Sequence, residues 1–396
     1  MLTKIIWAGL AFGTLTLCVM TILSVTNTKL ALVSTSEPAP LLASISNEPE
    51  TIVVGSNQDA AVIRNKRKQT QTATTTAPAP VVTPPVVSSS TPLRTMAWIY
   101  PGNPACGANT EIADGRNVHT LKAEFFTIAG GFLTLLDTTN TQCNGYSPQT
   151  IARLKQYSTE QYATVSSASV NDMESFFATA LLASSSDIAT LVNFATENNI
   201  TGIELDFEDF SSWSPRAYAN YKLFVTRLGN ELHKNGKKLT LDAPAISQTS
   251  EESWFIWRYA DFVTLPVDHM VVMAYDYQYD YGAGTPVAPL DWIKNVITYT
   301  SAHYPKEKIT IGLPSYGYQG TVGSYRMTIL THEQLRTKTG YATAVRDVRS
   351  GEMTWRSGTT VYFYQDSQSM RLKRDLVASQ GISSVSIWHL GGNQWF

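Results

Sequence analysis

The chain has 396 residues, of which 43% are hydrophobic, which is enough for one large domain with accessory segments or for two medium domains. Thirty basic residues against 32 acidic ones give a net charge of −2, which argues against a nucleic-acid-binding surface. The 19 tyrosines and nine tryptophans suit stacking on flat ligands such as sugars, although such residues also build ordinary cores.

The first residues predict an exported chain. Residues 5–25 carry no charge, and as a helix they would span about 30 Å of hydrocarbon. No Ala-x-Ala cleavage site follows closely, so we favour an uncleaved membrane anchor over a cleaved signal peptide for residues 1–32. Lys4 would stay in the cytoplasm, and both alternatives place the rest outside it, either anchored or secreted.

Residues 33–92 are rich in Ser, Thr, Pro and Ala and predict a disordered linker. Cys106 and Cys143 are the only cysteines after the apolar segment, and in an exported chain they could close a disulfide. The alternative is two unpaired thiols. The six histidines are scattered, so we expect neither a metal site nor a cofactor.

The folded domain is predicted from residue 93 to 396, where short apolar strands alternate with helical patterns. Helices are expected over 172–183, 187–198, 215–234 and 290–302. Eight strands with mainly helical crossovers predict a parallel (β/α)8 barrel rather than an open sheet. The expected strands are 96–100, 123–128, 162–167, 203–208, 238–244, 270–276, 308–314 and 384–388.

One strand carries an unusual acidic face. Residues 203–208 alternate apolar and acidic, so Glu204, Asp206 and Glu208 would share one face. Same-face neighbours lie roughly 6–7 Å apart, and three carboxylates so placed in a half-dry site should raise the pKa of at least one. A carboxylic acid protonated near neutral pH is what a general acid needs. The alternative is a solvated acidic strand edge.

Active-site groups of such barrels project from the carboxyl ends of the strands. Single residues there can instead serve packing or structural hydrogen bonds, which is the interpretation we favour for Asp242, and a lone aromatic such as Tyr100 usually packs. The candidates at predicted strand ends are Tyr100, Glu208, Asp242, Tyr275, Asp276, Tyr316 and Trp388.

Several motifs, in order along the chain, resemble family 18 of the glycoside hydrolases. Residues 202–208 (Gly-Ile-Glu-Leu-Asp-Phe-Glu) resemble its D-G-x-D-x-D-x-E signature, with Thr201 and Glu204 where the family has Asp. Residues 273–276 (Met-Ala-Tyr-Asp) resemble M-x-Y-D, and residues 311–317 resemble G-x-P-x-Y-G. Residues 387–391 resemble the segment with the last-strand Trp.

Two further segments are similar to the bacterial spore-cortex and cell-wall members of that family: residues 121–126 to their second strand, and residues 363–369 to the segment before their last helix. On this comparison, residues 317–381 would form a small α+β insertion that includes the last helix.

The resemblance implies a retaining glycosidase in which the substrate's own 2-acetamido group attacks the sugar. Glu208 would be the general acid, Asp206 would orient the acetamido group, and Glu204 would share a proton with Asp206. Glu204 is one methylene longer than the family's Asp, so it should crowd or displace Asp206. Tyr275 would bind the acetamido oxygen.

The resemblance also implies the substrate contacts. Asp276 would contact the distorted sugar, and Trp388 would form the floor of its subsite. Met273, Tyr316 and Tyr100 are further expected substrate contacts.

The expected substrate is a polysaccharide that contains N-acetylglucosamine, with peptidoglycan or a related wall glycan before chitin, and we expect a monomer. The competing hypothesis is a non-catalytic, chitinase-like lectin on the surface. Relatives that bind without cleaving usually lack the final Glu of the signature, whereas Glu208 is present.

Overall fold

The computed structural model describes residues 93–100, 102, 118–139, 141, 143–167, 169–178 and 184–393. The predicted anchor and linker, residues 1–92, lie outside these ranges. Within them, the structure contains no helix of the length and apolar character needed to cross a bilayer.

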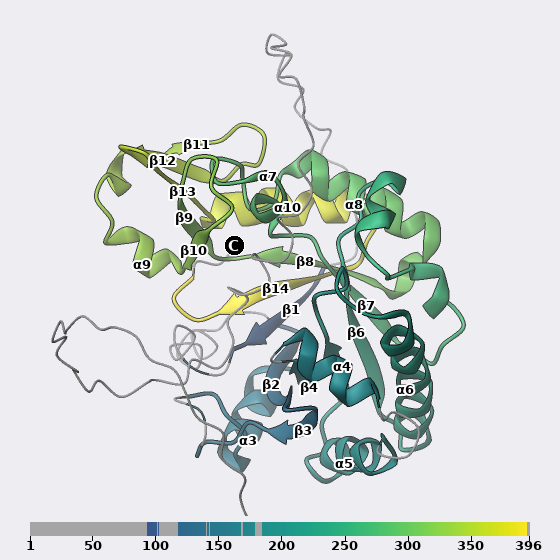
Figure 1. The fold of residues 1–396 in the computed structure, drawn as a ribbon. Helices are drawn as coiled ribbons and strands as arrows, with labels where there is room; N and C mark the ends of the chain where they lie inside the picture. Colours follow the sequence, from purple (N-terminus) through teal and green to yellow (C-terminus); the bar gives the residue numbers. More distant parts are fainter. Residues whose placement is uncertain are drawn as a thin grey trace, which may run out of the picture. The chain divides into compact units, whose positions relative to one another are not determined.

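Eight of the described strands form a closed parallel barrel, which confirms the predicted fold (Figure 1). Each strand pairs with its neighbours, and β1 pairs with both β14 and β2, which closes the ring. The barrel strands are β1 Arg94–Ile99, β2 Thr120–Ala129, β4 Glu160–Ser167, β5 Gly202–Asp206, β6 Lys238–Pro244, β7 His269–Met273, β8 Ile309–Pro314 and β14 Ser384–Leu390.

The helix α6, Pro215–Lys234, begins and ends at the residues that its sequence predicts. Pro215 occupies the first turn, the Ser214 side chain accepts from Ala217 N, and Gly236 after the end has a φ of 67°. The other described helices are α3 Pro148–Tyr157, α4 Val170–Ala178, α5 Ser184–Glu197, α7 Tyr277–Tyr281, α8 Leu290–His303, α9 His332–Arg336 and α10 Ser367–Ser379. Short 3-10 helices are η3 Thr249–Trp254, η4 Tyr259–Phe262, η5 Lys306–Lys308 and η6 Tyr341–Thr343.

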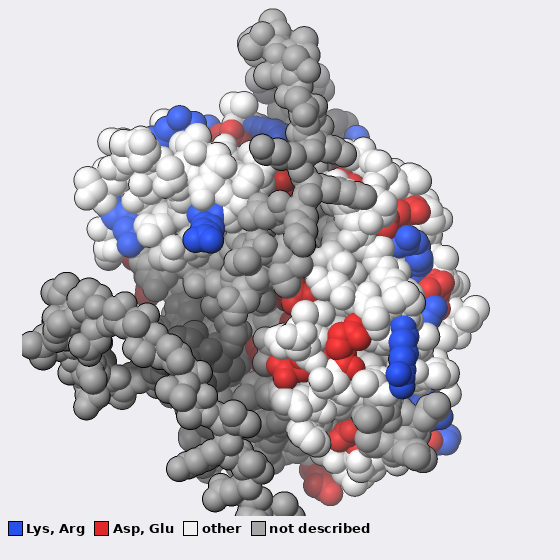
Figure 2. Space-filling model, viewed as in Figure 1, with Lys and Arg blue, Asp and Glu red and all other residues white. Residues whose placement is uncertain are grey.

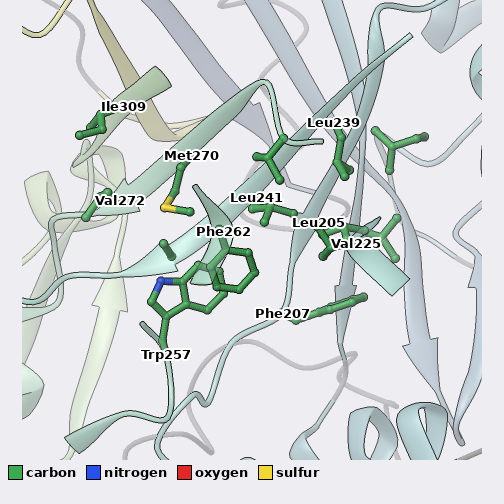
Figure 3. Packing of buried hydrophobic residues seen from close by; sticks show 14 of the residues in the cluster. Leu205, Phe207, Val225, Leu239, Leu241, Trp257, Phe262, Met270, Val272 and Ile309 are labelled. Carbon is green, nitrogen blue, oxygen red and sulfur yellow. The ribbon is translucent and has the colours of Figure 1, made fainter. Parts of the chain in front are cut away.

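The strands divide their side chains between two environments, as the two-residue period requires. The odd-numbered residues of β5 and β6, such as Leu205 and Leu241, pack with α6 and with the stacked rings of Trp257 and Phe262 (Figure 3). The even-numbered residues, such as Glu204, point into the barrel. The acidic face of the predicted strand is therefore an interior face, and not a solvated edge.

Two predicted strands end at least two residues earlier than expected, and β1 ends one residue earlier, at Ile99. β5 ends at Asp206, so Glu208 lies two residues beyond it, and β7 ends at Met273 rather than Asp276. The described pairing of β5 with β6 ends at Leu205. Beyond these ends the backbone turns, with Asp209 at φ 58° and Asp276 at φ 68°. Alternation of residue types continues past the point where a neighbouring strand supports the backbone, which explains the error.

Smaller differences concern the first half of the barrel. The helix expected over 172–183 is described from Val170 to Ala178 as α4, and residues 179–183 lie outside the described residues, so its predicted end stays a prediction. An antiparallel strand that was not predicted, β3 Phe132–Leu135, pairs with the end of β2. The connection is Gly130-Gly131, whose φ values of 60° and 78° suit glycine.

The chain between β8 and β14 contains the predicted small α+β insertion, which lies at upper left in Figure 1. Its antiparallel sheet has the order β10-β9-β13-β12-β11. The strands are β9 Gly317–Thr321, β10 Met327–Leu330, β11 Val345–Arg346, β12 Met353–Ser357 and β13 Thr360–Tyr364.

Buried polar contacts join this insertion to the rest of the domain. The Glu352 carboxylate accepts from the backbone N–H groups of Val287 and Ala288, both at 2.8 Å. Lys373 of α10 pairs with Glu352 at 3.2 Å and donates to Ser350 O at 3.0 Å. The sheet is thereby fixed to the loop before α8 and to the last helix.

Candidate active site

The predicted site residues gather around the carboxyl ends of the barrel strands. Asp206 ends β5 and Glu208 follows it, while Tyr275 and Asp276 follow β7. A pocket with about 540 Å³ of empty space opens beside them. Its lining is Glu208, Asp209, Phe210, Pro244, Ala245, Phe255, Met273, Tyr275, Asp276, Asp280 and Trp292.

The carboxyl group of Asp206 is partly shielded from solvent, and its pKa is strongly perturbed. Its Oδ1 atom is buried and has no hydrogen-bond partner. Burial, and then the nearby charges of Glu208 and Glu204, raise the pKa of Asp206 well above its ordinary value. This agrees with the expectation that at least one carboxyl of the acidic face is hard to ionise.

Glu204 lies deeper in the barrel and is fully buried. Its carboxylate pairs with the Lys122 ammonium and accepts from Trp98 Nε1 at 2.9 Å and from Thr164 Oγ1 at 2.7 Å. These three donors come from β2, β1 and β4, on one side of β5. The proton-sharing role with Asp206 that the family resemblance implies for Glu204 stays a prediction.

Tyr275, Asp276 and Tyr316 form one polar group. The buried Tyr316 hydroxyl donates to Asp276 Oδ1, and Gln278 Nε2 donates to the same atom at 3.2 Å. Burial and the surrounding carboxylates raise the pKa of Tyr275 well above its ordinary value, so its hydroxyl remains a donor at neutral pH. The side chain of Asp276 is thus fixed from two directions while its backbone turns.

Trp388 and Tyr100 continue the site toward β1. The Trp388 ring lies edge-on to Tyr316 at 5.2 Å and to Tyr100 at 6.5 Å between centroids, and nearly parallel to Tyr275 at 6.4 Å. The peptide bond after Trp388 is cis. Trp388 and Tyr100 are only partly buried, so both present ring surface near the pocket residues. Met273, also partly buried, lines the pocket itself.

Two further carboxyl groups belong to this region. Glu124 near the middle of β2 accepts from Ser166 Oγ at 2.5 Å, and burial raises its pKa to about 7. Burial raises the pKa of Tyr100, and the charge of Glu124 adds to this increase. Sequence reasoning missed Glu124, although Lys122 and Glu124 alternate with apolar residues on β2 as Glu204 and Asp206 do on β5.

Asp242 of β6 is fully buried, and neither of its carboxyl oxygens has a hydrogen-bond partner. Burial, and then Glu204 and Asp206, raise its pKa well above the ordinary value. The described contacts therefore give Asp242 no structural hydrogen bond through its carboxyl oxygens.

The predicted disulfide is described at one end alone. Cys143 is disulfide-bonded, whereas Cys106 lies outside the described residues, so the pairing of the two stays a prediction. Across the described ranges, no group of three or more His, Cys, Asp or Glu side chains is arranged to hold a metal ion.

On the face shown in Figure 2, lysine and arginine side chains are scattered among acidic and uncharged residues. The even distribution agrees with the composition of the chain. It gives this face no continuous basic stripe among the described residues.

Comparison with known proteins places these residues in a family. The family model described as glycosyl hydrolases family 18 matches residues 116–393. An uncharacterized glycosylase, YvbX of Bacillus subtilis (strain 168), is 27% identical over 212 residues, which cover 51% of this chain and 60% of YvbX. The cortical fragment-lytic enzyme of the same organism is 23% identical over 195 residues, covering 46% of this chain and 45% of that enzyme. The matches thus span about half the length of these curated relatives.

Solved structures share the fold. The spore cortex-lytic enzyme SleL of Bacillus cereus superimposes with a TM-score of 0.64 at 17% identity, covering 77% of this chain and 73% of SleL. A chitinase from Chromobacterium violaceum gives a TM-score of 0.62 at 22% identity, covering 76% of this chain and 95% of the chitinase.

Proposed function

Since the chain belongs to glycosyl hydrolases family 18, we propose that it is a retaining glycosidase that cleaves β-1,4 bonds next to N-acetylglucosamine. The observation that carries the proposal is the position of Glu208 at a pocket beside Asp206, whose raised pKa reflects a shielded acidic site. Tyr275 and Asp276 line the same pocket, and the aromatic ring of Trp388 lies next to Tyr275.

The proposed reaction uses the substrate's 2-acetamido group in place of a second attacking carboxylate. Glu208 donates its proton to the glycosidic oxygen as the bond breaks, and the acetamido oxygen attacks the anomeric carbon from the other face. Asp206 accepts a hydrogen bond from the acetamido N–H, and the Tyr275 hydroxyl donates to the acetamido oxygen. Water activated by Glu208 then opens the oxazolinium intermediate, so the sugar keeps its configuration.

Two residues bind the reacting sugar in this proposal. Asp276, whose Oδ1 is engaged by Tyr316 and Gln278, contacts the distorted ring with its other oxygen. Trp388 stacks beneath the sugar, and Tyr100 and Met273 extend the walls. Since the ordered contacts around Asp276 are made before substrate arrives, little side-chain freedom is lost on binding.

We propose peptidoglycan or a related wall glycan as the substrate, with chitin as the second candidate. The support is the similarity to an enzyme named for cortical fragment lysis, beside the fold shared with a chitinase. Both polymers contain N-acetylglucosamine, which the acetamido mechanism requires.

Release of reducing ends from N-acetylglucosamine oligomers and from peptidoglycan tests the activity. The Glu208→Gln variant should lose roughly 10²–10⁴-fold in rate, the usual contribution of a general acid. The matched control is Glu197→Gln, which changes an exposed glutamate at the end of α5 and should leave the rate unchanged. Equal rates for the wild type and Glu208→Gln would refute the glycosidase, and retained glycan binding in both would then favour a lectin.

A thiazoline mimic of the oxazolinium tests the mechanism separately. We expect it to inhibit the wild type competitively. Turnover of substrates that lack the acetamido group, together with no inhibition by the mimic, would rule out substrate assistance while leaving a glycosidase.

Export belongs to the same proposal and rests on the apolar residues 5–25 and on the disulfide-bonded Cys143. The N-terminal residue of the mature protein distinguishes an uncleaved anchor from a cleaved signal peptide. A cytoplasmic location of the full chain after fractionation would contradict both alternatives.

A further inference from the structure

Five carboxyl groups crowd the interior and the carboxyl end of the barrel, those of Glu124, Glu204, Asp206, Glu208 and Asp242. The proposed reaction assigns no role to Asp242. The Lys122 ammonium opposes the rise in the pKa of Asp242, and it forms its ion pair with Glu204. Every described hydrogen bond of the Glu204 carboxylate comes from a donor on its other side, so Glu204 is engaged as an ion pair. Asp206 Oδ1 is buried without a partner among the described hydrogen bonds, and Asp242 on the next strand is a carboxyl group that the proposed reaction leaves unassigned.

The register of the barrel places Asp242 beside Asp206. Glu204 pairs with Thr240, and Leu205 pairs with Leu241, so Asp206 and Asp242 follow next on neighbouring strands. Leu205 and Leu241, which precede the two aspartates, pack outward with α6. Successive residues of a strand point to opposite faces, so Asp206 and Asp242 both lie on the interior face. Neighbouring strands are about 4.8 Å apart, which brings the two carboxyl groups within reach of each other.

Both aspartates have buried carboxyl oxygens without a described hydrogen-bond partner. Asp206 Oδ1 and both Asp242 oxygens are buried without a partner. Two carboxylates are acceptors only and cannot bond to each other, but a carboxylic acid beside a carboxylate donates one strong hydrogen bond. One added proton thus satisfies an oxygen on each residue, whereas leaving buried polar atoms unsatisfied is costly.

We infer that Asp242 is the positioning residue that shares a single proton with Asp206, in the place that the family resemblance gives to Glu204. The inference rests on the proposed function for its catalytic consequence. When Asp206 turns toward the acetamido N–H as a carboxylate, the proton stays on Asp242, and the charge of the barrel interior does not change. Asp242 itself touches neither the substrate nor the reacting atoms.

The surroundings oppose full ionisation of the pair. The charged and titratable groups that act on Asp242 are Glu204 and Asp206 on β5, Lys122 on β2 and Glu208 after β5. The charge of Asp242 also contributes to the raised pKa values of Tyr221 on α6 and Tyr275 after β7. On β7, the residue paired with Asp242 is the apolar Val271. Burial raises the pKa of both aspartates, so full ionisation of the pair is opposed.

Carbon-13 NMR with labelled aspartate carboxyl groups, on the folded protein without substrate, tests the pair directly. In the wild type we expect the Asp206 and Asp242 resonances to titrate together in two steps, because a shared proton makes the pKa values a property of the pair. Asp242→Asn should convert Asp206 to a single step. The double variant Lys122→Met with Glu204→Gln, which removes the buried ion pair as a unit, should leave the two-step titration of the aspartates in place.

Kinetics supply the second measurement. Asp242→Asn should lower kcat by roughly 10–100-fold, as for loss of one hydrogen bond to a charged group, with little change in KM. Asp261→Asn is the matched control, because that aspartate pairs with Lys222 at the surface of α6 and should leave kcat unchanged.

The outcomes separate the two proposals. Independent single-step titration of Asp206 in the wild type overturns the role of Asp242, and so does a two-step titration that the double variant Lys122→Met with Glu204→Gln abolishes, whatever the activity. An intact two-step titration in a protein that fails the Glu208→Gln assay refutes the glycosidase and leaves the pair standing. If Asp242→Asn does not fold, the titrations of the wild type and of the double variant Lys122→Met with Glu204→Gln still decide.

Discussion

The Lys122 ammonium and the Glu204 carboxylate form an ion pair inside the barrel, 82 positions apart in the chain. Both side chains are at most 1% exposed, and the ammonium lies 3.3 Å from the centroid of the Trp98 ring. Buried pairs of this kind tolerate joint replacement better than loss of one member, because the remaining charge has no partner.

The variant Lys122→Met should therefore destabilise the protein by about 3–5 kcal/mol, since it leaves Glu204 buried and unpaired. The double variant Lys122→Met with Glu204→Gln should recover much of this loss. Urea denaturation of both measures the free energy of unfolding. A Lys122→Met variant within about 1 kcal/mol of the wild type would contradict the argument, because that is the size expected for a surface pair.

Removal of the Trp388 ring should weaken sugar binding. Trp388→Ala is expected to reduce affinity for N-acetylglucosamine oligomers roughly tenfold, the equivalent of about 1 kcal/mol or slightly more from lost stacking. Trp388→Phe should retain part of the affinity. Calorimetry in the Glu208→Gln background avoids turnover during the measurement. Unchanged affinity in Trp388→Ala would remove this residue from the proposed subsite.

The Tyr316 hydroxyl fixes Asp276, so Tyr316→Phe should lower kcat/KM by roughly 10–100-fold through loss of a hydrogen bond to a carboxylate. Tyr318→Phe is a close control. It also removes a buried hydroxyl, which donates to Thr285 O at 2.6 Å, but away from Asp276. Equal losses in the two variants would point to stability rather than to the position of Asp276.

Glu124 predicts a pH dependence of stability. Its pKa rises from 4.5 to about 7 in the folded protein, so between these values the folded state binds more protons than the unfolded one. Stability from this group is complete below about pH 4.5 and is lost as pH rises toward 7. Glu124→Gln cannot ionise and should flatten this part of the profile. Thermal unfolding midpoints measured over the same pH range would disprove the assignment if both proteins gave parallel profiles.

The sequence predicts the residues of the site whose signal is local. Asp206 and Glu208 are recognisable because their alternation lies within one short segment, and Tyr275 and Asp276 because they end another. The strand boundaries are less predictable, since residue alternation persists through Glu208 whereas pairing with the next strand ends at Leu205.

The partners of these residues depend on closure of the barrel. Lys122 contacts Glu204 of β5, and Glu124 contacts Ser166 of β4, because β4 pairs with both β2 and β5. Residues 121–126 alone do not predict these contacts.

The contacts of Glu352 limit how this domain can be recombined with its relatives. An engineer who exchanged residues 317–364 as a cassette would cut between Glu352 and its partners at Val287, Ala288 and Lys373. A replacement without an acidic residue at that position would leave the buried Lys373 ammonium without its ion-pair partner and two backbone N–H groups without an acceptor. The smallest unit that can be grafted as a whole therefore begins before α8 and ends after α10, so the wall of the cleft and part of the barrel must be inherited together.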